Sequence, residues 1–260
     1  MSKSRTLHVE AVVLRHSDWG EADRLLTLYT LQAGKLRAVA KGARRLRSRK
    51  AGHLEPFTRV TLLLARGRDL WIVTQAQTVA AYLALRDDLL RTGYAAYIVE
   101  LLDRFTYEEG ENLALYHLLH TTLERIDASP DVLLAVRYYE LRLLDLLGFR
   151  PELFHCVLCR KAIRPVDQFF SASLGGAVCP NCVTLPAAAG ARPVSMRALK
   201  YMRHLQRSSY PEAQRASIPE AVQSEIEALL QFYLAYHLER QLNTPAFLRE
   251  VSRDVPPAND

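Results

Sequence analysis

Four cysteines in two closely spaced pairs are the residues of this chain best suited to metal chemistry. The pairs are Cys156-x2-Cys159 and Cys179-x2-Cys182, and nineteen residues separate them. A C-x2-C pair can direct two sulfurs at one ion from a tight turn, and this gap suits a hairpin that joins two such turns, as in zinc ribbons. Four thiolates complete a tetrahedral shell, so we predict one structural Zn²⁺ with no open position for a substrate.

Disulfides, free thiols and an iron–sulfur cluster are the alternatives for these cysteines. A secreted disulfide scaffold would spread more cysteines over a smaller chain. A zinc deaminase is rejected, although His8-x-Glu10 and the second pair superficially match its motifs. Val178 rather than proline precedes Cys179, and the pair at Cys156 already completes the shell.

Positive charge is concentrated at one end of the chain. Residues 1–80 hold 15 Lys and Arg against 6 Asp and Glu, whereas residues 81–260 hold 19 against 22, so the whole surplus of +6 belongs to the first third. Residues 35–50 (KLRAVAKGARRLRSRK) contain eight cations and no carboxylate. Ordinary surfaces intersperse both signs, so this run favours a polyanionic partner, most simply nucleic acid, over a solvated loop. The predicted DNA-binding residues are Lys35, Arg37, Lys41, Arg44, Arg45, Arg47, Arg49 and Lys50.

Aromatic residues in the same third could stack on bases. The candidates are Trp19, Tyr29, Phe57 and Trp71. Trp19 stands beside a turn glycine and is the better candidate, whereas Trp71 lies in an apolar strand and is expected in the core. Near the cysteines, three further cations either offset the charge of a zinc–tetrathiolate group or contact DNA. They are Arg160, Lys161 and Arg164.

No catalytic constellation stands out in the sequence, and we predict that the protein is not an enzyme. The chain lacks a phosphate-binding G-x-x-x-x-G-K-[ST] loop, a G-x-S-x-G elbow and an H-E-x-x-H helix. Some acidic and histidine side chains could imitate a nuclease metal site, but turns and helix faces explain them better. They are Asp18, Glu21, Asp23, Asp87, Asp88, His117 and His120.

Hydrophobic periodicity divides the chain into parts. Residues 6–16 alternate, with Leu7, Val9, Ala11 and Val13 on one face. Four further short strands follow at residues 24–31, 35–40, 59–65 and 70–77. Five antiparallel strands in about 75 residues suit a small closed barrel, an OB-fold in preference to an SH3-like barrel.

Helical periodicity begins near residue 79. We predict helices at residues 92–107, 112–126, 131–147, 196–205 and 220–242. The helix at 220–242 has an apolar stripe that must be covered by another surface. We expect this helix to pack on the helices within 92–147. The fold class is therefore α+β multidomain, with four predicted parts: an OB-fold at 1–80, a helical domain at 81–152 and 187–248, an inserted four-cysteine zinc module at 153–186, and a flexible tail at 249–260.

Composition agrees with a protein of the cell interior. Hydrophobic residues make up 49% and charged residues 24%, which is ordinary for a globular protein. The amino-terminal residues MSKSRTLHVE contain no apolar signal region, and no run of about 18 apolar residues exists that could span a bilayer. We therefore expect a soluble, intracellular protein with no membrane association.

Taken together, these parts resemble the RecO family of bacterial recombination mediators. The motifs that carry the resemblance are KGARR at residues 41–45, LGFRPELFHCVLC at residues 147–159 and CPNC at residues 179–182. The likeness covers nearly the full chain. One departure is Arg160, where many relatives carry glycine; it is not a predicted ligand, so the metal prediction is unaffected.

The resemblance implies a non-enzymatic function in recombinational DNA repair. It implies binding of single- and double-stranded DNA, annealing of complementary strands, and action with RecR to load RecA onto DNA covered by single-strand DNA-binding protein (SSB). A functional link to RecF, contact with the acidic C-terminal tail of SSB and a cytoplasmic, nucleoid-associated location are also implied. We expect the tail to bind in a groove among the C-terminal helices.

Two other functions compete with this interpretation. An RNA- or ribosome-associated protein with an OB-fold and a zinc ribbon would show the same charge, because DNA and RNA give the same dependence on salt. A metal-dependent nuclease would use the acidic residues named above.

Overall fold

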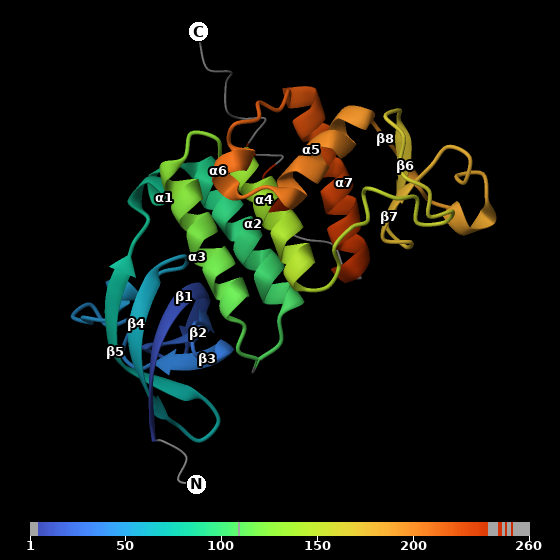
Figure 1. Cartoon of the computed structure of the whole chain (residues 1–260). Coiled ribbons are helices and arrows are strands. Elements are labelled where there is room, and N and C mark those ends of the chain that lie inside the picture. The colour runs from blue at the N-terminus through green and yellow to red at the C-terminus, as the bar shows by residue number, and fades with distance from the viewer. Residues whose placement is uncertain (1–4, 109, 239–243, 246–247, 249–250, 252–260) are drawn as a thin grey trace. The chain divides into compact units, whose positions relative to one another are not determined.

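The computed structural model describes residues 5–108, 110–238, 244–245, 248 and 251 (Figure 1). It contains two compact units. The first comprises residues 1–132 and 243–260, and the second comprises residues 133–242. The predicted division into four parts is not tested by this grouping and stays a prediction. The predicted flexible tail lies outside the described residues apart from Val251.

A closed five-stranded barrel forms the amino-terminal part of the first unit. Its strands are β1 (Thr6–Trp19), β2 (Asp23–Thr30), β3 (Gly34–Ala40), β4 (Arg59–Arg66) and β5 (Trp71–Ala80). Their order around the barrel is β1-β2-β3-β5-β4. All neighbours are antiparallel except β3 and β5, which pair in parallel where Ala38 meets Trp71. The predicted OB-like barrel is thereby confirmed.

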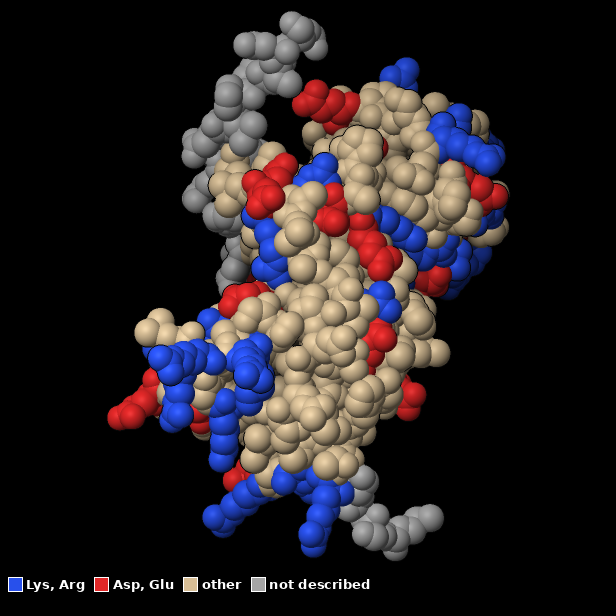
Figure 2. Space-filling view, turned by 90° about the vertical axis from the view of Figure 1, so that its left-hand side faces the viewer, with Lys and Arg blue, Asp and Glu red and all other residues tan. Residues whose placement is uncertain are grey.

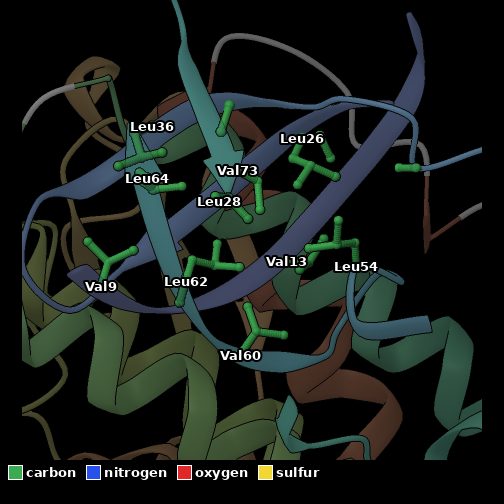
Figure 3. Close-up of a cluster of buried hydrophobic side chains, with 14 residues drawn as sticks. Val9, Val13, Leu26, Leu28, Leu36, Leu54, Val60, Leu62, Leu64 and Val73 are labelled. Carbon is green, nitrogen blue, oxygen red and sulfur yellow. The ribbon is translucent and has the colours of Figure 1, made fainter. Parts of the chain in front are cut away.

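Alternation along the strands fills the barrel with aliphatic side chains (Figure 3). The inward residues predicted on β1 behave as expected, since Val9, Ala11 and Val13 are fully buried and Leu7 packs against them. On the neighbouring strand β4, Leu62 pairs with Val9 and Leu64 pairs with Leu7, so these side chains lie side by side in the core. Trp71 is partly buried against this core, as predicted, whereas 48% of Trp19 is exposed.

Three helices follow the barrel in the first unit. They are α1 (Leu83–Asp87), α2 (Leu89–Phe105) and α3 (Leu113–Ala128). The Asp88 side chain accepts from the backbone N–H of Leu90 and Arg91, and so caps the first turn of α2. Asn112 caps α3 in the same way through the N–H of Leu115.

The second unit holds the remaining elements. They are α4 (Val132–Leu146), β6 (Gln168–Ser171), β7 (Gly176–Val178), β8 (Arg192–Val194), α5 (Met196–Arg207), α6 (Tyr210–Ala213) and α7 (Glu220–Leu238), with short 3₁₀ turns at Pro186–Ala188 here and Ala51–His53 in the barrel. Gly148, at φ +82°, and Pro151 follow the end of α4. The apolar stripe of α7 is buried, and its Glu227 pairs with Arg137 of α4. No described helix combines the length and apolar content that crossing a membrane requires.

Candidate metal centre and nucleic-acid interface

The four cysteines meet at one point of the second unit. Their sulfur atoms all lie within 4.8 Å of one another, and Sγ of Cys159 is 3.8 Å from Sγ of Cys179. All four are free thiols rather than disulfides. Among the residues that the structure describes, they are the one group of His, Cys, Asp and Glu side chains placed to hold a metal ion.

Two backbone turns and one hairpin bring the sulfurs together. In the first turn the N–H of Arg160 donates to the carbonyl of Cys156, and in the second the N–H of Cys182 donates to that of Cys179. The β6–β7 hairpin connects the turns, and the N–H of Val157 donates to the carbonyl of Ala177 on β7 at 2.9 Å. The hairpin predicted between the two pairs is therefore present, with Gly175 in its turn at φ +77°.

The chemistry of the thiols fits a cation. Burial would raise the pKa of Cys156, but backbone N–H groups, including that of Cys179, donate to its sulfur and lower the pKa to about 6. Hydrogen bonding to neighbouring thiols, chiefly Cys179, and burial raise the pKa of Cys182 to about 12. Four thiolates cannot gather here without a positive charge between them, so the cluster can hold a metal ion.

The cluster of buried side chains around the sulfurs is small. It comprises Cys156, Val178, Cys182 and Ala188, with partly buried apolar neighbours such as Phe169 packed against it. Two of its four buried members are candidate ligands, so a bound ion would add cohesion to this cluster. Arg160, exposed beside the site, adopts the left-handed backbone region at φ +60°, which favours glycine.

The predicted DNA-binding residues fall into two groups. Six lie on the segment that links β3 to the 3₁₀ turn at Ala51, residues 41–50, which we call the basic loop. Lys41, Arg44, Arg45, Arg47 and Arg49 are exposed there. Within the described part of the chain, no carboxylate lies within ion-pair distance of Lys41, Arg45, Arg47 or Arg49. The loop therefore presents uncompensated positive charge to solvent.

The basic loop is anchored at both ends. Near its start, the N–H of Gly42 donates to the Asp23 carboxylate at 2.7 Å, and Arg44 pairs with Asp18 at 3.1 Å. The Arg44 guanidinium also reaches the carbonyl of Gly20 in the β1–β2 turn. At its end, Nζ of Lys50 donates to the carbonyl of Val73 on β5. The exposed cations between these points are thus held in one region of the barrel surface.

Lys35 and Arg37 form the second group, on β3. Nζ of Lys35 donates to the carbonyls of Asp103 and Thr106, at the C-terminal end of α2, and pairs with the Asp103 carboxylate. Arg37 pairs with Glu108 at 2.6 Å. Both cations therefore join the barrel to the α2–α3 segment. The sequence did not predict that Asp103 and Glu108 pair with these cations, because the residues near Lys35 carry no indication of such distant partners.

The residues considered for other chemistry have local explanations. Asp18 and Asp23 anchor the basic loop, and Asp88 caps α2. His117 and His120 share a hydrogen bond of 3.1 Å, and His120 lies 3.4 Å from Glu124. These contacts give structural roles to Asp18, Asp23, Asp88 and the two histidines.

The fold places this chain in the class of modular proteins that combine a barrel, a helical region and a cysteine module. A closed OB-like barrel with an anchored basic loop precedes a helical region, and a four-cysteine module interrupts that region.

Comparison with known proteins identifies the family. The family model described as Recombination protein O N terminal matches residues 1–82, and that described as Recombination protein O C terminal matches residues 86–246. The DNA repair protein RecO of Roseiflexus sp. (strain RS-1) is 42% identical over 260 residues, which cover 99% of this chain and 91% of that protein. The DNA repair protein RecO of Pelotomaculum thermopropionicum is 40% identical over 92% of each chain. The chain therefore belongs to the RecO family, and the predicted resemblance is confirmed.

Proposed function

We propose that this chain binds single- and double-stranded DNA through the basic loop and anneals complementary strands without covalent chemistry. The observation that carries the proposal is the set of exposed, unpaired cations at Lys41, Arg45, Arg47 and Arg49 on an anchored loop. Annealing requires two polyanions to come close, and such a loop screens their repulsion. The related proteins are named DNA repair proteins, which supports DNA as the partner.

Salt dependence tests the binding step. Each phosphate that a cation neutralises contributes about 0.7 to the slope of log affinity against log salt for a single strand. Replacing Arg45 and Arg47 together by alanine should lower this slope by about 1.4 and slow annealing. The matched control, R150A/R215A, removes two exposed arginines from the second unit and should leave the slope unchanged. An unchanged slope in R45A/R47A would refute the assignment.

Competition between a DNA and an RNA oligonucleotide of the same sequence separates DNA repair from the alternative function in RNA binding. We expect the DNA oligonucleotide to compete at least as well as the RNA. Preference for RNA would favour a ribosome- or RNA-associated role. Cleavage of either oligonucleotide with magnesium or manganese, abolished by mutating Asp18 and Asp23, would instead indicate a nuclease.

For the cysteine module we propose one structural Zn²⁺ held by Cys156, Cys159, Cys179 and Cys182. Zinc would hold the two turns together and leave no position open for catalysis. Elemental analysis of the purified protein should find one zinc per chain, and Cys159→Ser should lose it. A coloured protein containing iron would contradict this assignment.

For protein partners we propose RecR, the SSB tail and a functional link to RecF and RecA, in the bacterial cytoplasm at the nucleoid. A groove of about 670 Å³ beside α5 combines cations such as Arg197 and Lys200 with apolar Met196 and Pro219. That mixture suits an acidic peptide with an apolar end. Lys200→Glu should weaken binding of an SSB tail peptide at least tenfold by fluorescence anisotropy, and unchanged binding would exclude this groove.

A further inference from the structure

Three arginines gather at the β4–β5 turn of the barrel, away from the basic loop in sequence. Arg66 is the last residue of β4, and Arg68 lies in the turn. Arg5 precedes β1, and its carbonyl accepts a hydrogen bond from the N–H of Arg66 at 2.9 Å. All three residues are exposed. We call this group the turn cluster.

Positive charge at the turn cluster is not neutralised by neighbours. Asp69 is the one carboxylate in the turn, and in the part of the chain that the structure describes no ion pair joins an acid to Arg5, Arg66 or Arg68. The turn is narrow, because the N–H of Gly67 donates to the carbonyl of Leu70 at 3.1 Å. The arginines are therefore fixed to a well-defined point of the barrel.

Strand β5 connects the turn cluster to the basic loop. It starts at Trp71 directly after the turn, and Lys50 at the end of the loop bonds to Val73. Val73 is the third residue after Leu70, which places the two about 10 Å apart along the extended chain. Figure 2 shows Lys and Arg side chains gathered at the left and at the bottom of the lower part of the molecule.

Past Arg66, the paired side chains of β4 and β5 in this region are uncharged. Ala65 faces Ile72 between the turn and Val73, and beyond Val73 Leu63 faces Gln75 and Thr61 faces Gln77. Amide and hydroxyl groups can hydrogen-bond to nucleotides. Neither β4 nor β5 contains a carboxylate, so no negative charge on these strands would repel a polyanion. A single strand that advances about 3.4 Å or more per nucleotide needs only a few nucleotides to span 10 Å.

We propose that the turn cluster is a second phosphate-binding contact, so that one single strand extends from the basic loop along β5 to Arg66 and Arg68. This inference rests on the proposed function, since it extends the same nucleic-acid site. It also explains why both groups of cations are left unpaired on one barrel.

The experiment compares R66A/R68A with R45A/R47A and R150A/R215A, using oligo(dT) of about 20 nucleotides across a salt series. R66A/R68A should lower the salt slope by about 1.4, as R45A/R47A does. The effect should shrink for a dinucleotide, which is too short to occupy both points at once. Thermal unfolding of each variant confirms that the barrel is intact.

The outcomes separate this inference from the proposed function. A wild-type slope in R66A/R68A together with a reduced slope in R45A/R47A would overturn the second contact and leave the basic loop as the binding site. A wild-type slope in both variants, or no salt-dependent binding by the unmodified protein, would overturn both. Equal weakening by R150A/R215A would show that net charge alone is responsible and would also overturn the second contact.

Discussion

Lys35 shows how one cation of a basic segment can have a structural role. Only 12% of its side chain is exposed, and Nζ contacts two carbonyls near the end of α2, including that of Asp103 at 2.6 Å. A cation at a helix C-terminus interacts favourably with the helix dipole and satisfies its last carbonyls.

We expect Lys35→Ala to destabilise the first unit by about 1–3 kcal/mol, because the Asp103 carboxylate and the helix end lose their partner. The measurement is the free energy of unfolding in urea. Lys41→Ala, on the exposed basic loop, is the matched control and should leave it unchanged. Equal stability of the two variants would contradict the structural role of Lys35.

Arg160 is a second residue of interest, because its backbone conformation decides how a substitution there changes stability. At φ +60° its Cβ is disfavoured, and glycine relieves this cost although it also increases the entropy of the unfolded chain. Arg160→Gly should therefore raise the stability of the metal-loaded protein by up to about 1 kcal/mol, measured as the unfolding midpoint. The neighbouring Lys161→Gly, at a position without a positive φ, should give no gain. A lower midpoint for Arg160→Gly would contradict the backbone argument.

At the level of elements, Glu10 of β1 links the barrel to its neighbouring helix. Its Oε1 accepts from Arg59 of β4 at 2.6 Å and from the Tyr116 hydroxyl of α3 at 2.9 Å. Burial alone would raise the pKa of Glu10, but these hydrogen bonds and the charge of Arg59 outweigh it and hold the pKa below its usual value of 4.5. The carboxylate therefore stabilises the folded state when it is ionised.

The sign of the pH dependence follows from that lowered pKa. The contribution of Glu10 is present above the unfolded pKa near 4.5 and is lost as the pH falls through the folded pKa. Glu10→Gln should cost about 1–2 kcal/mol at pH 7, and its difference from wild type should shrink below pH 4.5. Urea unfolding at pH 7 and pH 3 measures this, with the exposed Glu21→Gln as control. A difference that stays constant with pH would rule out the ionised carboxylate as the source.

At the level of the whole molecule, the barrel and the cysteine module differ in the size of their buried clusters. The barrel has a large cluster of buried aliphatic side chains that includes Val13, Leu28 and Leu62, whereas two of the four buried residues in the cluster around the sulfurs are cysteines. Structural zinc sites supply about 10–16 kcal/mol of apparent folding energy in small modules, so metal removal should affect the cysteine module and leave the barrel folded.

Metal removal tests this difference. After chelation, backbone amides of β6 and β7 should lose their protection from hydrogen exchange, while those of β1–β5 keep theirs. Single-strand binding through the basic loop should persist. Loss of protection throughout both units, or none in β6 and β7, would contradict a metal that acts only on its own module.

The sequence by itself determined the features that depend on near neighbours. Two C-x2-C turns, a period of two along the strands and a run of cations between Lys41 and Lys50 are all local patterns, and the structure has a cysteine cluster, a barrel and an exposed loop where they predict them. Turn chemistry and side-chain alternation depend on only a few adjacent residues, so they can be seen without a fold.

Only the tertiary structure decided which cations are free. Lys35 and Arg37 belong to the same basic run as Arg45, yet long-range packing places Asp103 and Glu108 against them, about 70 residues away in the chain. Packing likewise placed Arg5 beside Arg66 through the pairing of β1 with β4. Such partners are chosen by barrel closure and helix packing, which bring together residues whose local sequences carry no sign of each other.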